Sequence, residues 1–388
     1  MTMTRREVPI TGSVLAWARD EAGLAPADVA ATLGVDVATV EAWESGAALP
    51  SRGQFSKLAE LLRRPTALFF LPEPPRKAGL PTSLRSAPGL MGHRLSKEEV
   101  RQIRWARRLQ QIVAWVLRDE GSAEVDLPRY STDDRSIEAA ATVRRILGVP
   151  PAEQLAWESP SEAFRSWRDA LEELGVLVIQ LQLGRESVRG FSAWDDHAPI
   201  VGVNTAYHPT ARIFTLFHEL GHLVTRTDAA CLRFIVPADP EVGAERWCER
   251  FAAELLLPAD ALRSVASHFG ISAHGRVEDV DTARKIAARF KVSTRAASLR
   301  LQELQLAPPS LYGMVERELA DRDWNAQAGG GGGQPAPEKR LRELGTRIPE
   351  ILIDAAKGGR LTRSDLSDYL HLTTGQVDDL RSLVATGA

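Results

Sequence analysis

The spacing of apolar residues predicts a chain built mainly from amphipathic helices. In several segments apolar residues recur at intervals of three and four, which places them along one face of an α-helix. Short segments of this kind lie between residues 13 and 64, and a longer one covers residues 96–120. Others lie at residues 209–224 and 241–257, and the pattern is helical again after residue 338. The expected class is therefore multidomain and mainly α.

The segment at residues 209–224 carries the most informative pattern. Pro209 suits the first position of a helix, and the apolar stripe consists of Ile213, Phe214, Phe217, Leu220 and Val224. The same helix contains the sequence HELGH, from His218 to His222. Because residues four apart lie one above the other on a helix, both imidazoles project from the same face.

Two imidazoles at that separation supply half of a tetrahedral zinc site, in which Zn–N distances are about 2.0–2.1 Å. Glu219 follows the first histidine, where a carboxylate can take a proton from the attacking water. The alternative is that both histidines are ordinary core residues hydrogen-bonded to the backbone. Gly221 costs roughly 1 kcal/mol relative to alanine inside a helix, so we expect another segment to approach closely there.

A catalytic zinc site needs a third protein ligand, and the helix that ends at Pro258 offers one. Projected at about 100° per residue, its apolar face is centred on Ala244, Trp247, Cys248, Phe251 and Leu255. Glu245 falls at the edge of that face, whereas Glu249 lies further toward solvent and Glu254 lies on the opposite edge. Glu245 is therefore the carboxylate best placed to reach inward. The helix dipole alone also favours a glutamate near a helix N-terminus, which leaves a structural role open.

The segments FTLFHELGHLV and AERWCERFAAELLLP together resemble the ImmA/IrrE family of metallopeptidases. By that resemblance the zinc ligands are His218, His222 and Glu245, and Glu219 is the general base. Cys248 departs from the family, in which alanine is more common at this position. A small buried residue is expected there, with a thiolate that competes for the metal as the alternative.

The resemblance covers most of residues 134–310 and implies a zincin-like α+β core. Its small three-stranded sheet would come from three runs of sequence. They are GVLVIQLQL starting at Gly175, VRGFSAWDD starting at Val188 and PIVGVNT ending at Thr205. Asn204 matches the usual asparagine before the catalytic helix. The segment DVDTARKIAARFKVSTRAASLRLQELQL resembles the helical pair that follows the active site.

Residues 1–75 read as a separate module. The phrase LGVDVATVEAWESGAALPS resembles the XRE family of helix-turn-helix DNA-binding domains, which implies a five-helix domain with Gly34 at the turn. No Lys or Arg occurs from residue 36 to residue 46, so the candidate DNA contacts are Arg19, Thr39 and Arg52. Glu44 either faces the groove or is structural. The alternative to DNA binding is a protein-interaction or dimerisation module.

The rest of the chain divides into connectors and helices. Residues 76–133 contain an extended connector rich in Pro, Ser and Gly, followed by the helix at 96–120. The basic outer face of that helix is interpreted as solvated rather than phosphate-binding. Residues 311–337 are assigned to a linker around a glycine run, and residues 338–388 resemble another helix-turn-helix. Its acidic character favours partner docking over DNA.

Composition agrees with an intracellular enzyme. The net charge of −3 argues against a nucleic-acid-binding surface over the whole 388-residue chain. Cys231 and Cys248 are too few for a disulfide framework. The first residues lack the apolar core of a signal peptide, and no apolar run approaches the roughly 18 residues of a membrane span. We therefore expect a cytoplasmic protein without membrane attachment.

These features predict a zinc-dependent endopeptidase that cleaves a regulatory protein. The resemblance implies an XRE-type repressor as substrate, and its cleavage would derepress stress, phage or mobile-element genes. Tyr207, His208 and Arg212 are the candidate oxyanion stabilisers, and the strand from Val188 to Asp196 could pair with an extended substrate. The alternatives are a peptidase of general specificity and a DNA-binding regulator or toxin–antitoxin component with a secondary zinc site. A homodimer is compatible with each of them.

Overall fold

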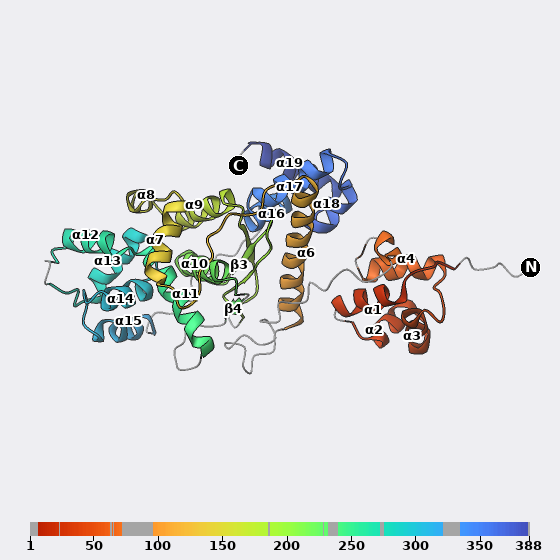
Figure 1. Cartoon of the computed structure of the whole chain (residues 1–388), viewed down its shortest axis with the longest axis horizontal. Coiled ribbons are helices and arrows are strands. Elements are labelled where there is room, and N and C mark those ends of the chain that lie inside the picture. Colours follow the sequence, from red (N-terminus) through yellow and green to blue (C-terminus); the bar gives the residue numbers. More distant parts are fainter. Residues whose placement is uncertain are drawn as a thin grey trace, which may run out of the picture. The chain divides into compact units, whose positions relative to one another are not determined.

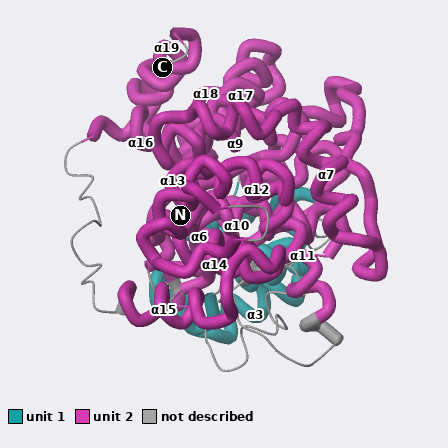
Figure 2. The backbone as a smooth tube through the Cα atoms, turned by 90° about the vertical axis from the view of Figure 1, so that its left-hand side faces the viewer, with its two compact units in different colours: residues 1–79 teal, residues 80–388 magenta. Residues whose placement is uncertain are grey.

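A computed structural model describes residues 7–22, 24–62, 64, 66–71, 96–184, 187–227, 229–231, 240–271, 275–320 and 334–386. The chain forms two compact units, residues 1–79 and residues 80–388 (Figure 2). The connector predicted over residues 72–94 and the glycine run at 329–333 lie outside the described residues. Each unit has its own hydrophobic core.

The first unit is a small helical domain with a buried apolar centre (Figure 1). It consists of α1 (Gly12–Glu21), α2 (Pro26–Leu33), α3 (Val37–Ser45), α4 (Arg52–Leu61) and the short 3₁₀ helix η1 (Thr66–Phe70). Gly34 follows α2 in the left-handed conformation, with φ 69°, where the turn was predicted. Asp36 then caps α3 by accepting a hydrogen bond from the Thr39 amide at 2.7 Å. The predicted five-helix domain is confirmed.

An ion pair between α1 and α3 accounts for the presence of Glu44, one of the acidic residues of α3. Arg19 Nε lies 2.5 Å from Glu44 Oε1, and Arg19 Nη2 lies 3.1 Å from Glu44 Oε2. Both side chains are largely buried, at 12% and 13% exposure. The hydrogen bond to Glu44 raises the pKa of Arg19. Glu44 therefore has a structural role in joining the two helices.

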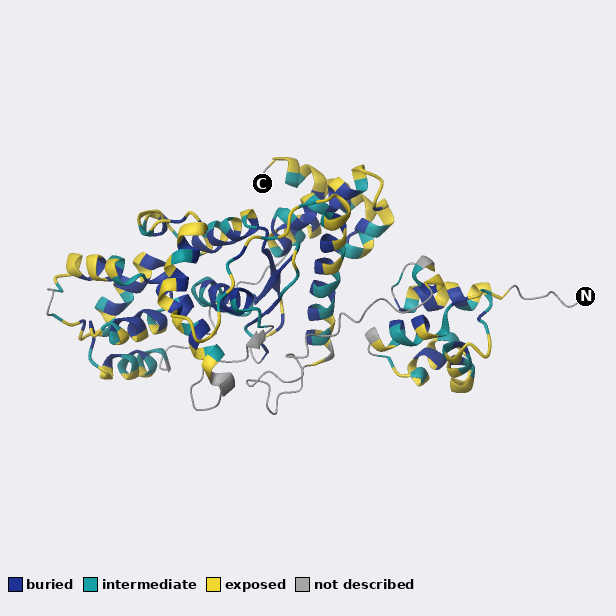
Figure 3. Cartoon of the chain, viewed as in Figure 1, coloured by how far each residue is buried: buried dark blue, intermediate teal, exposed yellow. Residues whose placement is uncertain are grey.

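The second unit is organised around a mixed sheet with the strand order β1–β3–β2–β4. Its strands are β1 (Leu177–Leu181), β2 (Gly190–Ala193), β3 (Ile200–Asn204) and β4 (Ala229–Cys231). Strand β1 is parallel to β3, whereas β2 is antiparallel to both β3 and β4. The three predicted strands are confirmed, and β4 extends the sheet. The residues of β1, β2 and β3 are buried, because helices cover both faces (Figure 3).

Helix α10 (Pro209–Thr225) lies on the inner face of this sheet, against β2 and β3. Val178, Val201 and Val203 point toward it and share a core with Phe217 and Leu220. Helices α9 (Pro160–Glu173) and α11 (Pro240–Leu256) pack against α10, and α7 (Ser136–Ile146) packs against α11. Helices α8 (Pro151–Ala156), α12 (Ala259–His268) and α14 (Thr294–Glu303) pack against α13 (Val280–Phe290). Among the described helices, none combines the length and apolar character needed to cross a membrane.

The assignment of residues 311–337 to a linker is wrong over its first part. Residues 310–320 form α15 (Ser310–Ala320), which packs against α13 and α14. Leu311 and Val315, four residues apart, are fully buried there. Because residues four apart share one face of a helix, these two side chains define the face of α15 that packs on the core.

The outer face of the sheet is covered by α6 (Lys97–Asp119) together with the C-terminal helices (Figure 1). Those helices are α16 (Ala336–Leu344), α17 (Arg347–Lys357), α18 (Arg363–Leu370) and α19 (Thr374–Thr386). Ile103 and Leu109 of α6 share a core with Leu177 and Ile179 of β1. The C-terminal region is helical as predicted, and it packs on the same sheet as α10 rather than standing apart.

Glu172, near the end of α9, is a buried acid where the inner helices meet the C-terminal region. It is 5% exposed, and burial raises its pKa to about 7, although Arg168 and the Arg347 backbone amide oppose the shift. Its neighbour Asp169 adds to the increase. The folded pKa lies above the ordinary value of 4.5, so the protonated carboxyl stabilises the fold. That contribution is lost as the pH rises from about 4.5 to about 7.

We therefore expect the free energy of unfolding to fall by up to about 3 kcal/mol between about pH 5 and about pH 8 because of Glu172. Glu172→Gln removes this part of the pH dependence, and chemical denaturation at both pH values measures it. Glu173→Gln, at the exposed neighbouring position, is the matched control and keeps the wild-type profile. Equal pH dependence in wild type and Glu172→Gln would contradict the assignment.

Candidate metal centre

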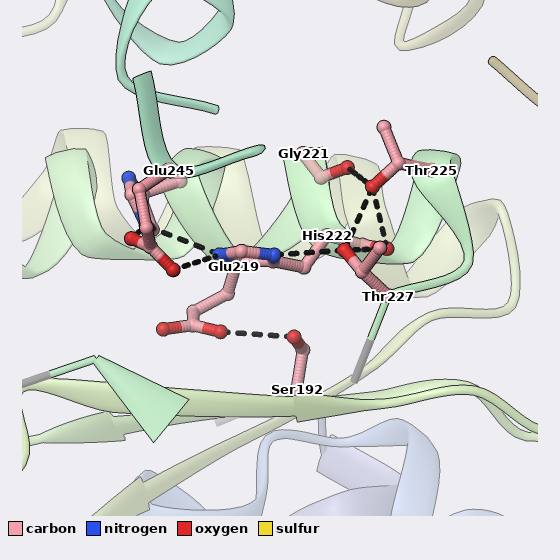
Figure 4. A network of polar contacts seen from close by, with 8 residues as sticks. Ser192, Glu219, Gly221, His222, Thr225, Thr227 and Glu245 are labelled. Carbon is pink, nitrogen blue, oxygen red and sulfur yellow. Dashed lines mark hydrogen bonds and ion pairs between the residues drawn. The ribbon is translucent and has the colours of Figure 1, made fainter. Parts of the chain in front are cut away.

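Helices α10 and α11 bring two histidines and one glutamate to a common point. His218 Nε2 lies 3.1 Å from Glu245 Oε2, and His222 Nε2 lies 3.3 Å from Glu245 Oε1 (Figure 4). The two Nε2 atoms are 3.3 Å apart. Within the described part of the chain, these three residues form the group of ligand atoms that all lie within 4.8 Å of one another. Two imidazole nitrogens and one carboxylate oxygen are a donor set that suits zinc.

The electrostatics of Glu245 suit a metal ligand. Burial raises its pKa, but hydrogen bonds with His218 and His222 outweigh that effect and hold the pKa well below its usual range. The carboxylate is therefore ionised, as coordination requires. It is 31% exposed at the side chain, whereas the two histidines are nearly fully buried. The site thus opens on the side of Glu245.

Cys248 and Glu249, the alternative third ligands on α11, have a different character. Burial raises the pKa of the Cys248 thiol well above its ordinary value, and nearby carboxylates raise it further. Burial also raises the pKa of Glu249, which is half-buried. Both effects favour the uncharged forms, and neither residue joins the converging group around His218. These observations support Glu245 as the third ligand.

Close helix packing at Gly221 determines how near α11 comes to α10. A Cβ atom at Gly221 would lie 3.0 Å from Cys248 Sγ and 3.1 Å from Cys248 Cβ. Cys248 itself is fully buried. The predicted close approach at Gly221 is confirmed, and Cys248 is the small residue that fills the contact. A larger side chain at either position would push Glu245 away from the histidines.

Glu219 lies between α10 and the sheet and is fully buried. Ser192 Oγ of β2 donates a hydrogen bond of 2.9 Å to Glu219 Oε2 (Figure 4). The neighbouring Gly190 leaves room for this carboxylate, because a Cβ there would lie 2.5 Å from Thr215 Cγ2 and 3.2 Å from Glu219 Cγ. Ser192 was not among the residues predicted from the sequence. Strand alternation indicates its face, but no local signal identifies a partner 27 residues away.

The C-terminal end of α11 is held by buried side chains from three other helices. Arg144, Gln154 and Arg300 donate to the carbonyl groups of residues 255–257, at 3.1 Å for Gln154 and 3.2 Å for Arg300. The last carbonyls of a helix have no partners within the helix, so these hydrogen bonds replace them. They fix the position of α11, and through it the position of Glu245. None of these three side chains was predicted from the sequence.

The candidate oxyanion stabilisers lie around the start of α10. Tyr207 and His208 precede the helix, and Arg212 precedes Glu219 by seven residues, which is about 10 Å along the helix axis. Arg212 donates a hydrogen bond to Gln180 of β1, and burial lowers its pKa to about 10. Burial also lowers the pKa of His208. The role of these three residues in stabilising an oxyanion remains a prediction.

The hypothesis that an extended substrate pairs with the strand at residues 188–196 is contradicted for β2. Residues 190–193 pair with β3 on one side, and residues 190–192 pair with β4 on the other. Both edges of this strand are therefore occupied within the chain. A backbone-paired substrate would have to use another edge.

The three candidate DNA contacts differ in their surroundings. Arg19 is held by Glu44, and both the amide and the hydroxyl of Thr39 donate to Asp36 Oδ1, at 2.7 and 2.5 Å. Arg52 is exposed at the first position of α4. Arg52 is thus the cation of this set that faces solvent. Its contact with DNA remains a prediction.

Comparison with known proteins gives two family matches. Residues 171–302 match the model of the IrrE N-terminal-like domain, a peptidase family, and residues 12–69 match a helix-turn-helix domain. The chain is 26% identical over 198 residues to the radiation response metalloprotease IrrE of Deinococcus deserti, covering 45% of this chain and 66% of that protein. It is 29% identical over 143 residues to the radiation response metalloprotease IrrE of Deinococcus radiodurans, covering 34% and 41%. Both matches span less than two thirds of the relative's length.

Proposed function

We propose that this chain is a zinc-dependent endopeptidase, on the premise that residues 171–302 match the IrrE N-terminal-like peptidase family and residues 12–69 match a helix-turn-helix family. The observation that carries the proposal is the convergence of His218, His222 and Glu245 next to the buried Glu219. These three residues would hold the zinc ion. When bound there, zinc supplies a Lewis acid that polarises the scissile carbonyl.

Glu219 provides the proton transfers of peptide hydrolysis. Its carboxylate removes a proton from water as the water oxygen bonds to the carbonyl carbon. It then delivers that proton to the amide nitrogen as the C–N bond breaks. The hydrogen bond from Ser192 holds the carboxylate in one orientation during both transfers. A structural zinc site does not require such a buried base, so Glu219 supports catalysis over a structural role.

The proposed substrate is a regulatory protein, specifically an XRE-type transcriptional repressor. A helix-turn-helix domain in the same chain can bring the peptidase to the repressor's operator or to the repressor itself. Cleavage of the repressor would derepress stress, phage or mobile-element genes. Both relatives are named radiation response metalloproteases, which supports a stress-related role. We place the chain in the cytoplasm, where such repressors act.

The test is incubation of the purified chain with an XRE-type repressor encoded beside its gene, with zinc and with a chelator. Mass spectrometry would identify discrete products that require zinc. An unstructured protein such as casein serves as the comparison substrate. Zinc-dependent cleavage of the repressor alone supports the proposal, whereas equal cleavage of casein indicates general specificity. Absence of zinc-dependent cleavage of any such repressor would count against it.

A DNA-binding regulator or toxin–antitoxin component with a secondary zinc site is the second candidate. The helix-turn-helix match and the exposed Arg52 favour it. The exposed acids Asp36 and Glu41 on or beside α3 oppose it, because they repel phosphates. A mobility-shift assay with operator DNA, comparing wild type with Arg52→Ala, separates the two. Persistence of the cellular phenotype in Glu219→Gln would favour the regulator.

A further inference from the structure

Helix α10 ends about one turn after His222, and the residues that follow it fold back toward this histidine. Arg226 is left-handed, with φ 59°, and its amide donates to the Leu223 carbonyl at 3.2 Å. The Thr227 amide then donates to the His222 carbonyl at 2.9 Å. This pair of hydrogen bonds is the Schellman arrangement, in which the residue after the left-handed position folds back onto the last turn. It brings the Thr227 hydroxyl to the His222 ring.

A chain of hydroxyl groups connects that ring to the helix backbone. Thr227 Oγ1 lies 2.9 Å from His222 Nδ1 and 2.9 Å from Thr225 Oγ1 (Figure 4). Thr225 Oγ1 lies 2.9 Å from the Gly221 carbonyl and 3.2 Å from the His222 carbonyl. Both threonines are partly buried.

The carbonyl at one end of this series of hydroxyl groups determines the direction of its hydrogen bonds. A carbonyl only accepts hydrogen bonds, so the Thr225 hydroxyl donates to Gly221. Thr225 Oγ1 is then the acceptor for the Thr227 hydroxyl, and Thr227 Oγ1 is the acceptor for His222 Nδ1–H. The reverse order would leave two oxygens 2.9 Å apart without a proton between them at Gly221. The hydroxyl groups therefore favour the proton of neutral His222 on Nδ1, whereas Glu245 Oε1, 3.3 Å from Nε2, favours the opposite tautomer when no metal is bound.

We propose that Thr227, oriented by Thr225, is the positioning residue that holds His222 in the Nδ1–H tautomer. In this tautomer the lone pair of Nε2 faces Glu245 and His218, at 3.3 Å from each. That lone pair is the one a metal needs. This inference rests on the proposed zinc site but not on peptide hydrolysis.

Other metal sites indicate how much zinc affinity should be lost when the hydrogen bond between Thr227 and His222 is removed. A hydrogen bond to the second nitrogen of a metal-binding histidine fixes both tautomer and ring orientation, and its loss typically weakens metal binding by about 10–100-fold. Thr227→Val keeps the volume and branching of the side chain but lacks the acceptor. Thr227→Ser keeps the hydroxyl. Thr210→Val is a matched control, because Thr210 makes the same kind of contact with His208 Nδ1, at 3.0 Å, away from the ligands.

Zinc affinity of the full chain, measured by competition with a chromophoric chelator, is the first readout. We expect Thr227→Val to bind zinc about 10–100-fold more weakly than wild type, with Thr227→Ser and Thr210→Val close to wild type. Thermal unfolding of the zinc-free proteins identifies variants that are not folded. A folded Thr227→Val with wild-type affinity overturns the proposal, and so does an equal loss in Thr227→Ser.

The second readout needs no variant of Thr227. In the zinc-free wild type, at a pH where histidines are neutral, ¹⁵N chemical shifts distinguish the two tautomers, and His222→Ala assigns the signal. The Nδ1–H form supports the proposal, and the Nε2–H form overturns it. Failure of peptide hydrolysis is a separate result, because both readouts can be obtained from a chain that cleaves nothing.

Discussion

Replacement of Glu219 by glutamine is expected to reduce the rate of zinc-dependent cleavage by about 10²–10⁴-fold, the usual contribution of a general acid–base group. The amide cannot accept the proton of water, so both proton transfers lose their carrier. It is almost the same size as the carboxylate, and its oxygen can still accept the hydrogen bond from Ser192. The variant is therefore expected to fold and to bind zinc as the wild type does.

Single-turnover cleavage of the partner repressor, together with the zinc content of the same samples, measures this effect. Glu153→Gln, an identical chemical change at an exposed position on α8, is the control and should retain the wild-type rate. Wild-type cleavage by Glu219→Gln would exclude Glu219 as the base. Loss of zinc in that variant would instead assign Glu219 to the metal site.

Removal of any one of His218, His222 and Glu245 is expected to abolish stoichiometric zinc binding. Three protein donors hold a catalytic zinc ion, and each alanine variant leaves two. The two histidines are each 2% exposed, so the cavity left by alanine lies inside the protein and cannot recruit a solvent-exposed side chain. After dialysis, elemental analysis should give zinc near one per chain for wild type and background for each variant.

The Glu245→Ala variant also tests the ligand assignment, because α11 carries two alternatives. Glu249→Gln and Cys248→Ala are the matched controls, and both are expected to retain zinc. Burial favours the uncharged forms of these two side chains, whereas Glu245 is held ionised by the histidines. Retention of zinc in Glu245→Ala, with loss in one of the controls, would transfer the third ligand to that residue.

Much of the site was predicted from the spacing of residues within single helices. The interval of four between His218 and His222 requires only a helix to bring two imidazoles to one face. The position of Glu245 at the edge of an apolar stripe came from the same periodicity. Gly221 indicated a close contact because glycine is unfavourable inside a helix, and Cys248 lies at that contact.

Contacts between residues that are distant in the sequence could not be predicted from local spacing. Ser192 and Glu219 lie on different elements, and their contact depends on how α10 crosses the sheet. Arg144 and Arg300, which hold the end of α11, lie more than 40 residues from the carbonyls that they bind. An arginine on an amphipathic helix has no sequence signal that separates a solvated role from a buried one.

The sequence by itself determined the donor types, their spacing on α10 and the helical character of both units, because these follow from the periodicity of single elements. Only the tertiary structure decided that Glu245 reaches the two histidines, that Ser192 and Thr227 support Glu219 and His222, and that β2 has no open edge. It also placed α6 and the C-terminal helices on the outer face of the sheet. The physical reason is that a periodic pattern specifies which face of an element is buried, whereas the identity of the neighbour depends on packing between segments distant in the chain.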